Sequence, residues 1–152
     1  MTTLENAWFS ASKAGYHEDI AELIERKVDP NIVDALGSTG LHYAAGGGHP
    51  KCTKHILGMP NVNVNAINKA GDTPLHKAVA KTHKGTLECV ELLIAAGANT
   101  ALTNKAGQLA KDIAKGDDVK ASLVPVGIVE GYDPDDEPDP NASDDDSDSD
   151  TD

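Results

Sequence analysis

The sequence predicts an all-α solenoid of about four helix-turn-helix units joined by short connecting turns. The first observation is a repeat: residues 37–45 (GSTGLHYAA) return 34 residues later as residues 71–79 (GDTPLHKAV), and a weaker copy follows at residues 107–114. The second is composition, because aromatic residues make up only 3% of the chain. A core of Ala, Leu, Val and Ile suits closely stacked helices, and units of this length share one core with their neighbours.

The first helix of each unit is predicted from its start signals. Thr39 and Thr73 are good N-cap residues, and Pro74 occupies the first helical position, where its missing N–H is not needed. Alanines follow, so neighbouring helices can approach closely.

The second helices are predicted from glycine breaks and apolar spacing. Residues 46–48 and Gly85 interrupt the helical pattern, and Gly97 lies where glycine usually follows a helix. Apolar residues then recur at helical intervals, at Ile20, Leu23, Ile24, Ile56, Leu57, Val90, Leu92, Leu93 and Ile94.

These signals divide the chain into a repeat domain, residues 1–127, and a tail. The predicted units are residues 4–33, which lack a leading turn, 34–67, 68–103 and a degenerate unit at 104–124. Small insertions explain why the offsets exceed 33 residues.

Thr73-Pro74-Leu75-His76-Lys77-Ala78 matches the T-P-L-H-x-A signature of ankyrin repeats. Over about residues 4–124 the chain therefore resembles the ankyrin-repeat family. Within it, residues 35–39, 60–65, 68–73 and 97–123 are similar to ankyrin regions of the osteoclast-stimulating factor 1 type, although no room for an SH3 domain is expected before Leu4.

The resemblance implies that a protein partner binds the turn tips and the first helices, which line a concave surface. Tyr43 and Leu36 are expected to be the main anchors. The predicted contact residues are Asp34, Ala35, Leu36, Ser38, Tyr43, Gly46, Asn68, Lys69, Ala70, Asp72, Lys77, Lys81, Asn104 and Lys105.

Charge is strongly divided along the sequence. Residues 1–127 hold 13 acidic and 13 basic side chains, whereas residues 128–152, the acidic tail, hold 12 acidic and none basic. Such a segment is expected to be disordered. Ser143, Ser147 and Ser149 each precede an Asp by three residues, a pattern typical of acidophilic kinase sites.

The same charge division bears on partners and location. The tail would repel phosphates, so nucleic acid is not expected to bind, and no apolar run long enough to span a membrane is present. Without a recognisable secretory signal, Cys52 and Cys89 indicate a reducing compartment, the cytosol or also the nucleus. We expect a monomer with two packed thiols and no disulfide.

Several constellations have two interpretations each. His42 and His76 are expected to bond backbone groups between units rather than hold a metal. Trp8 and Phe9 could anchor a partner but are expected to close the end of the stack. The lysines of unit three form either a solvated face or a patch for an acidic partner; they are Lys69, Lys77, Lys81 and Lys84.

No catalytic or phosphate-binding motif is apparent, so neither enzyme activity nor a cofactor is predicted. Two functions remain. One is an adaptor or scaffold that holds a protein partner on its concave face, with an enzyme inhibitor as a variant. The other is an escort chaperone whose acidic tail shields a basic client, such as a ribosomal or histone-like protein.

Overall fold

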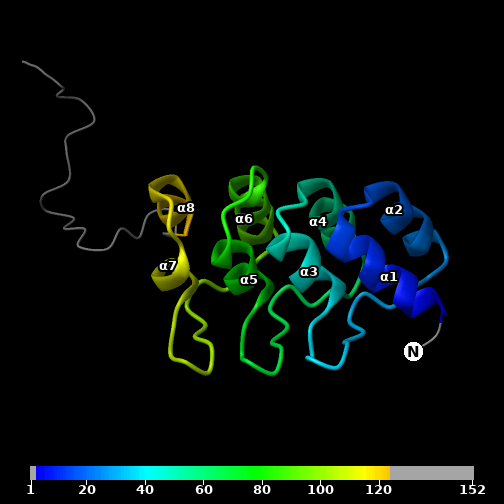
Figure 1. The fold of residues 1–152 in the computed structure, drawn as a ribbon, viewed down its shortest axis with the longest axis horizontal. Coiled ribbons are helices and arrows are strands. Elements are labelled where there is room, and N and C mark those ends of the chain that lie inside the picture. The colour runs from blue at the N-terminus through cyan, green and yellow to red at the C-terminus, as the bar shows by residue number, and fades with distance from the viewer. Residues whose placement is uncertain (1–2, 124–152) are drawn as a thin grey trace, which may run out of the picture.

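The computed structural model describes residues 3–123, and this part of the chain forms a row of helix pairs without strands (Figure 1). This confirms the predicted all-α solenoid. The helices are α1 (Thr3–Ala14), α2 (His17–Glu25), α3 (Gly40–Gly46), α4 (Pro50–Leu57), α5 (Pro74–Ala80), α6 (Thr86–Ala95), α7 (Ala110–Ile113) and α8 (Asp117–Ser122).

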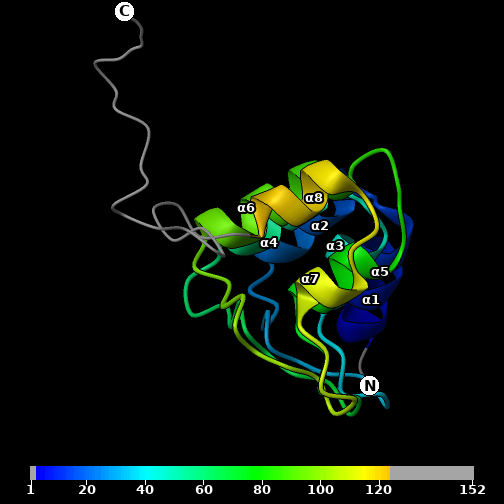
Figure 2. The ribbon, with the colours of Figure 1, turned by 90° about the vertical axis from the view of Figure 1, so that its left-hand side faces the viewer.

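The helices form two layers. The first helices of the units, α1, α3, α5 and α7, pack in sequence against one another, and the second helices, α2, α4, α6 and α8, form a parallel row behind them. The long turns between units all project to the same side of the stack (Figure 2). The exposed sides of the first helices and the turn tips therefore belong to one continuous surface.

Threonine caps start the two central first helices, as predicted. The Thr39 hydroxyl accepts a hydrogen bond from the amide of His42, and Thr73 does the same with His76. In the fourth unit the capping position holds Leu109, which has no oxygen to offer, and Asp112 alone accepts the Leu109 amide at 2.9 Å. This missing cap is a physical reason why α7 has only four residues.

His42 and His76, the slot histidines, join neighbouring units. Nδ1 of His42 accepts the Thr39 amide at 3.0 Å, and Nε2 donates to the carbonyl of Asp72 in the next unit at 2.8 Å. His76 repeats this arrangement, with Nε2 donating to the Gln108 carbonyl at 2.9 Å. The prediction that these histidines bond backbone groups between units is confirmed.

Two further kinds of bond cross the unit boundaries. At the tips, the Lys69 amide donates to the Leu36 carbonyl, and the Lys105 amide donates to the Ala70 carbonyl, both at 3.0 Å. Behind the tips, asparagine side chains reach across each boundary. Asn31 binds the backbone of Asn61 and Asn63, and Asn65 binds that of Gly97 and Asn99.

A continuous apolar core runs from Trp8 in α1 to Leu123 at the end of α8. Trp8 is fully buried and Phe9 is 5% exposed, so both belong to the core of the first unit and neither is available as a partner anchor. Cys52 and Cys89 are buried free thiols. Burial raises the pKa of the Cys52 thiol to about 11, which keeps it protonated and unreactive.

Two glycines let the second and third units touch through their backbones. A Cβ atom on Gly85 would lie 2.3 Å from the carbonyl oxygen of Gly48, far inside van der Waals contact. Gly48 itself has φ +69°, a conformation that favours glycine. The glycine run that the sequence places at the helix–helix turn thus also fixes how closely adjacent units approach.

Candidate protein-binding groove

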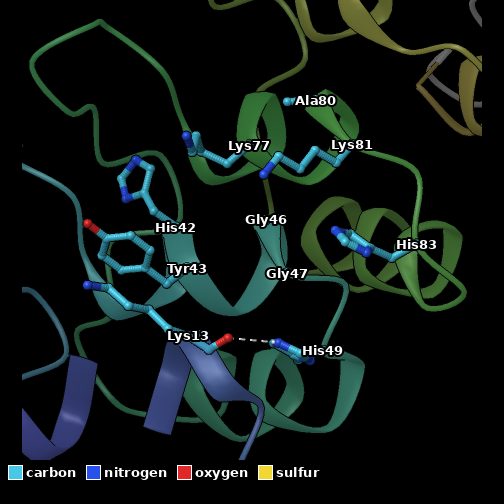
Figure 3. Close-up of a pocket in the computed structure, with 10 residues that line it drawn as sticks. All are labelled: Lys13, His42, Tyr43, Gly46, Gly47, His49, Lys77, Ala80, Lys81 and His83. Atoms are coloured by element: carbon cyan, nitrogen blue, oxygen red, sulfur yellow. Dashed lines mark hydrogen bonds between the residues drawn. The ribbon is translucent and has the colours of Figure 1, made fainter. Parts of the chain in front are cut away.

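The surface formed by the first helices contains a groove of about 530 Å³, located where α1, α3 and α5 lie side by side. Figure 3 shows the side chains that surround it. This groove is lined by Lys13, His42, Tyr43, Gly46, Gly47, His49, Lys77, Ala80, Lys81 and His83.

Glycines form the floor of the groove. A Cβ on Gly46 would come within 3.3 Å of the Lys77 Cβ, and one on Gly47 would lie 2.6 Å from Nε2 of His49. Larger residues would therefore push the flanking side chains apart or fill the space between them. The floor is open because these positions lack side chains.

Tyr43 forms one wall and is held in a fixed orientation. Its hydroxyl donates a hydrogen bond to the carboxylate of Asp34, and its ring meets Phe9 edge-on with centroids 6.1 Å apart. The ammonium of Lys13 lies 4.8 Å from the Tyr43 ring centroid, a cation–π contact. Tyr43 is therefore half-buried and serves both the fold and the surface.

The pKa values of this pair follow from the contact. Burial, together with the bond to Asp34, raises the pKa of Tyr43 to about 12. Partial burial by itself would raise the pKa of Asp34, but the hydrogen bonds from Tyr43 and from the amides of Ser38 and Leu36 outweigh it and lower the value. At neutral pH the donor is a neutral phenol and the acceptor a charged carboxylate.

The groove is electropositive. Lys13, Lys77 and Lys81 line it, and no carboxylate does. Within residues 3–123 none of these three ammonium groups forms an ion pair, in contrast to Arg26, which pairs with Glu22 at 3.3 Å. The two patch lysines predicted to lie on this face are therefore joined by a third cation from the first unit.

His42 contributes no charge to the groove at neutral pH. Burial lowers its pKa below the ordinary value of 6.5, and its two ring nitrogens are fixed as one acceptor and one donor by the bonds to Thr39 and Asp72. His49 is also oriented, because its Nε2 donates to the Lys13 carbonyl at 3.1 Å.

The lowered pKa of His42 predicts a pH-dependent stability. Below pH 6.5 the unfolded chain takes up a proton on His42 that the folded chain resists, so stability present above 6.5 is lost as pH falls. We expect the free energy of unfolding, measured by urea titration, to decrease between about pH 7.5 and pH 5.5. The decrease should be smaller in His42→Gln, and an unchanged slope in that variant would contradict the assignment.

The turn tips present a mixture of engaged and exposed residues. Asp34, Asn68 and Asn104 occupy equivalent positions, and each side chain accepts an amide two residues on, at 2.9, 3.0 and 3.0 Å. They shape the tips. The predicted contact residues that are exposed there are Ala35, Leu36, Lys69, Ala70 and Lys105.

The prediction that Ser38 contacts a partner is wrong. Ser38 is only 2% exposed, and its hydroxyl accepts a hydrogen bond from the Asn68 side chain of the next unit at 3.3 Å. Asp72, the equivalent residue one unit later, is likewise engaged, by Asn104 at 3.0 Å. This position lies between adjacent tips, where the stacking of units covers it.

Six residues that line the groove were not among the predicted contact residues; they are Lys13, His42, Gly47, His49, Ala80 and His83. His49 and His83 lie 34 residues apart, the repeat offset, and Lys13 holds the position in unit one that Gly46 and Ala80 hold in the next two. Aligning the units residue by residue would have placed these three residues on the same face. Lys69 and Lys84 of the predicted lysine cluster do not line the groove.

No group of three or more His, Cys, Asp or Glu side chains in residues 3–123 could hold a metal ion. No helix in the same range is long and apolar enough to cross a membrane. The acidic tail and its serines, Ser143, Ser147 and Ser149, lie outside the described residues.

Comparison with known proteins identifies the repeats. Residues 8–104 match the family model for ankyrin repeats in three copies. The chain is 34% identical over 95 residues to the putative ankyrin repeat protein YahD of Escherichia coli (strain K12), across 61% of this chain and 47% of that protein. It is 36% identical over 98 residues to ankyrin repeat domain-containing protein 37 of Mus musculus, across 64% and 59%.

The match to a third relative covers more of this chain but only a small part of that relative's length. The chain is 31% identical over 118 residues to oxysterol-binding protein-related protein 1 of Rattus norvegicus, across 76% of this chain and 12% of that protein. The chain spans about half the length of YahD and somewhat more of the mouse protein. Ankyrin repeats generally mediate protein–protein interaction, and the family match covers the three units that build the groove. The chain belongs to the ankyrin-repeat family.

Proposed function

We propose that this protein is an adaptor or scaffold that holds one protein partner in the concave groove and against the turn tips. The main support for the proposal is that predicted contact residues from two units lie together on one surface. Tyr43 and Gly46 of the second unit and Lys77 and Lys81 of the third line one groove. Leu36 has 63% of its surface exposed at a tip, and its amide donates to the same Asp34 carboxylate that accepts the Tyr43 hydroxyl. An exposed aliphatic side chain next to a cationic groove offers both an apolar anchor and a charge preference.

The proposal predicts a separation of binding from stability at Leu36. Because Leu36 is 63% exposed, Leu36→Ala should change the free energy of unfolding by less than about 0.5 kcal/mol. It should weaken partner capture by roughly fivefold or more, the effect of losing about 1 kcal/mol at an interface. Pulldown yield and thermal melting on the same variants measure both quantities.

Tyr43 provides the comparison. Tyr43→Ala also removes the contact with Phe9 and the bond to Asp34, so it should lower both binding and melting temperature. A Leu36→Ala variant that loses as much stability as binding would assign Leu36 to the core and remove it from the proposed surface.

The escort chaperone is the second candidate, and the 12 acidic side chains of residues 128–152 favour it. Pulldowns with the full chain and with a chain lacking residues 128–152 separate the two functions. An adaptor keeps its partner after tail removal. An escort loses the basic client, such as a ribosomal or histone-like protein, or the client's solubility, and its binding falls steeply with salt. Equal, low recovery of unrelated proteins by both chains would argue against any specific binder.

The proposal also includes the oligomeric state, the location and the relationship of the protein. We propose a monomer without enzyme activity or cofactor that acts in the cytoplasm and also the nucleus and does not bind nucleic acid. The stretches at residues 35–39, 60–65 and 68–73 support a relationship to the ankyrin region of osteoclast-stimulating factor 1. Phosphorylation of Ser143, Ser147 and Ser149 would add to the charge of the acidic tail.

A further inference from the structure

The lining of the groove has a net positive charge, because it contains three lysines and no carboxylate. Lys77 and Lys81 lie on one side of the glycine floor and Lys13 on the other, as Figure 3 shows. The carboxylate of Asp34 feels the charge of Lys13, which helps to lower its pKa, but it is held by the Tyr43 hydroxyl and two backbone amides and does not line the groove. Three cations around a narrow space favour an extended anionic occupant.

We propose that the acidic tail of the same chain, residues 128–152, binds in this groove. The tail offers 12 carboxylates and no basic side chain. It is therefore complementary in charge to the groove, and being covalently linked it meets the groove at an effective concentration on the order of millimolar. A separate acidic peptide would therefore need a concentration on the order of millimolar to compete with the linked tail for the groove.

The end of the stack lies close enough for this contact. His83 lines the groove, and it also lines a second cavity with Lys115, Gly116 and Val119 at the start of α8. The six residues of α8 span about 9 Å. An extended chain advances about 3.3 Å per residue, so the nine residues between Leu123 and Asp133 can cover roughly 30 Å, enough to return past α8 to the groove.

The charge distribution of the stack directs the tail to this face. Residues 4–33 hold six acidic and three basic side chains, whereas residues 34–103 hold four acidic and six basic ones. The first unit therefore repels the tail, and the second and third attract it. Among the other lysines of these units, Lys51 and Lys54 share a cavity with the carboxylate of Glu25, which opposes their charge.

The contact would regulate access to the proposed partner surface. A partner that uses the groove must displace the tail, so deleting residues 128–152 should increase the affinity for such a partner. Phosphate added to the tail serines would strengthen the internal contact. This consequence rests on the proposed adaptor function, whereas the contact itself does not.

Paramagnetic broadening in the full chain tests the contact. A spin label is attached through Ser147→Cys, since Cys52 and Cys89 are fully buried and protected from the label. At about 50 mM salt the amide signals of Gly46, Lys77 and Lys81 should broaden, and at about 500 mM, where screening is strong, they should recover.

A charge-matched pair of variants gives the control. Lys77→Gln/Lys81→Gln should reduce the docked-to-undocked ratio about fivefold, the effect expected from losing two partly exposed ion pairs. Lys51→Gln/Lys54→Gln changes the net charge equally on the opposite row of helices and should leave the broadening in place.

Three results would overturn the proposal. They are absence of groove broadening at low salt, equal loss in both lysine variants, and broadening that arises only between molecules in a mixture of isotope-labelled and spin-labelled chains. The last result would assign the groove to the tail of a second copy. None of the three affects the adaptor proposal, which is tested by partner capture with the Leu36→Ala and tail-less chains.

Discussion

Replacing Trp8 by alanine should cost the protein about 3–5 kcal/mol of folding free energy, the range for large aromatic residues in a core. Trp8 is fully buried and is among the largest side chains in the core. It packs against the start of α3, where a Cβ on Gly40 would lie only 2.5 Å from the indole nitrogen. Urea unfolding followed by circular dichroism measures the loss.

Two variants sharpen this expectation. Trp8→Phe keeps most of the apolar volume and also removes the indole N–H, which is buried without a hydrogen-bond partner, so it should cost clearly less than Trp8→Ala. Tyr16→Ala removes a 61% exposed aromatic side chain of the same unit and should change stability by less than about 0.5 kcal/mol. A Trp8→Ala variant as stable as Tyr16→Ala would contradict the burial of Trp8.

The effect should extend to the groove. Lys13 and the Phe9 ring, both on α1, contact Tyr43 on α3. In a repeat stack each unit is stabilised mainly by its neighbours, so a weakened first unit can unfold before the rest. Partner binding should then decrease in Trp8→Ala even under conditions where the central units remain folded.

Replacing His42 by alanine should cost about 3 kcal/mol, mainly because it leaves polar groups without partners. The Thr39 amide loses its acceptor and the Asp72 carbonyl loses its donor, at a site where His42 is fully buried. The cavity left by the imidazole adds to the cost. Because the bond to Asp72 joins units two and three, unfolding should also become less cooperative.

His55→Ala is the matched control for this variant. His55 is exposed on α4 and stacks on His17 at 6.2 Å between ring centroids, so its loss should be small. Comparable destabilisation by His42→Ala and His55→Ala would show that the slot bonds contribute little. Fluorescence-monitored and circular-dichroism-monitored urea curves, compared for coincidence, report the change in cooperativity.

Local sequence signals predicted the fold because they determine local structure. A threonine followed three residues later by a slot histidine specifies a capped helix start, and the structure shows both such starts at Thr39 and Thr73. The small side chains of the first helices similarly specify close packing. The absence of a capping oxygen at Leu109 agrees with the shortness of α7.

The groove was only partly predictable, because it is formed between units. Tyr43, Gly46, Lys77 and Lys81 were expected on this surface, but Lys13 reaches it from another unit by crossing the face of Tyr43. Ser38 was expected to be an exposed tip residue, but the next unit covers it. Both outcomes depend on how far neighbouring units overlap. The sequence pattern within a single unit does not specify this overlap.

The hydrogen bonds at the unit boundaries have a consequence for how such a protein can gain repeat units during evolution. The slot histidine, the tip amide and the asparagine each recur about 34 residues apart and bind mainly backbone groups of a neighbouring unit. The histidine and the asparagine bind the following unit, and the tip amide binds a carbonyl of the preceding one. Backbone acceptors are present whatever the side chains are. A gene duplication that copied residues 34–67 would therefore encode a longer stack whose new boundary uses the same bonds, with its surface side chains free to diverge.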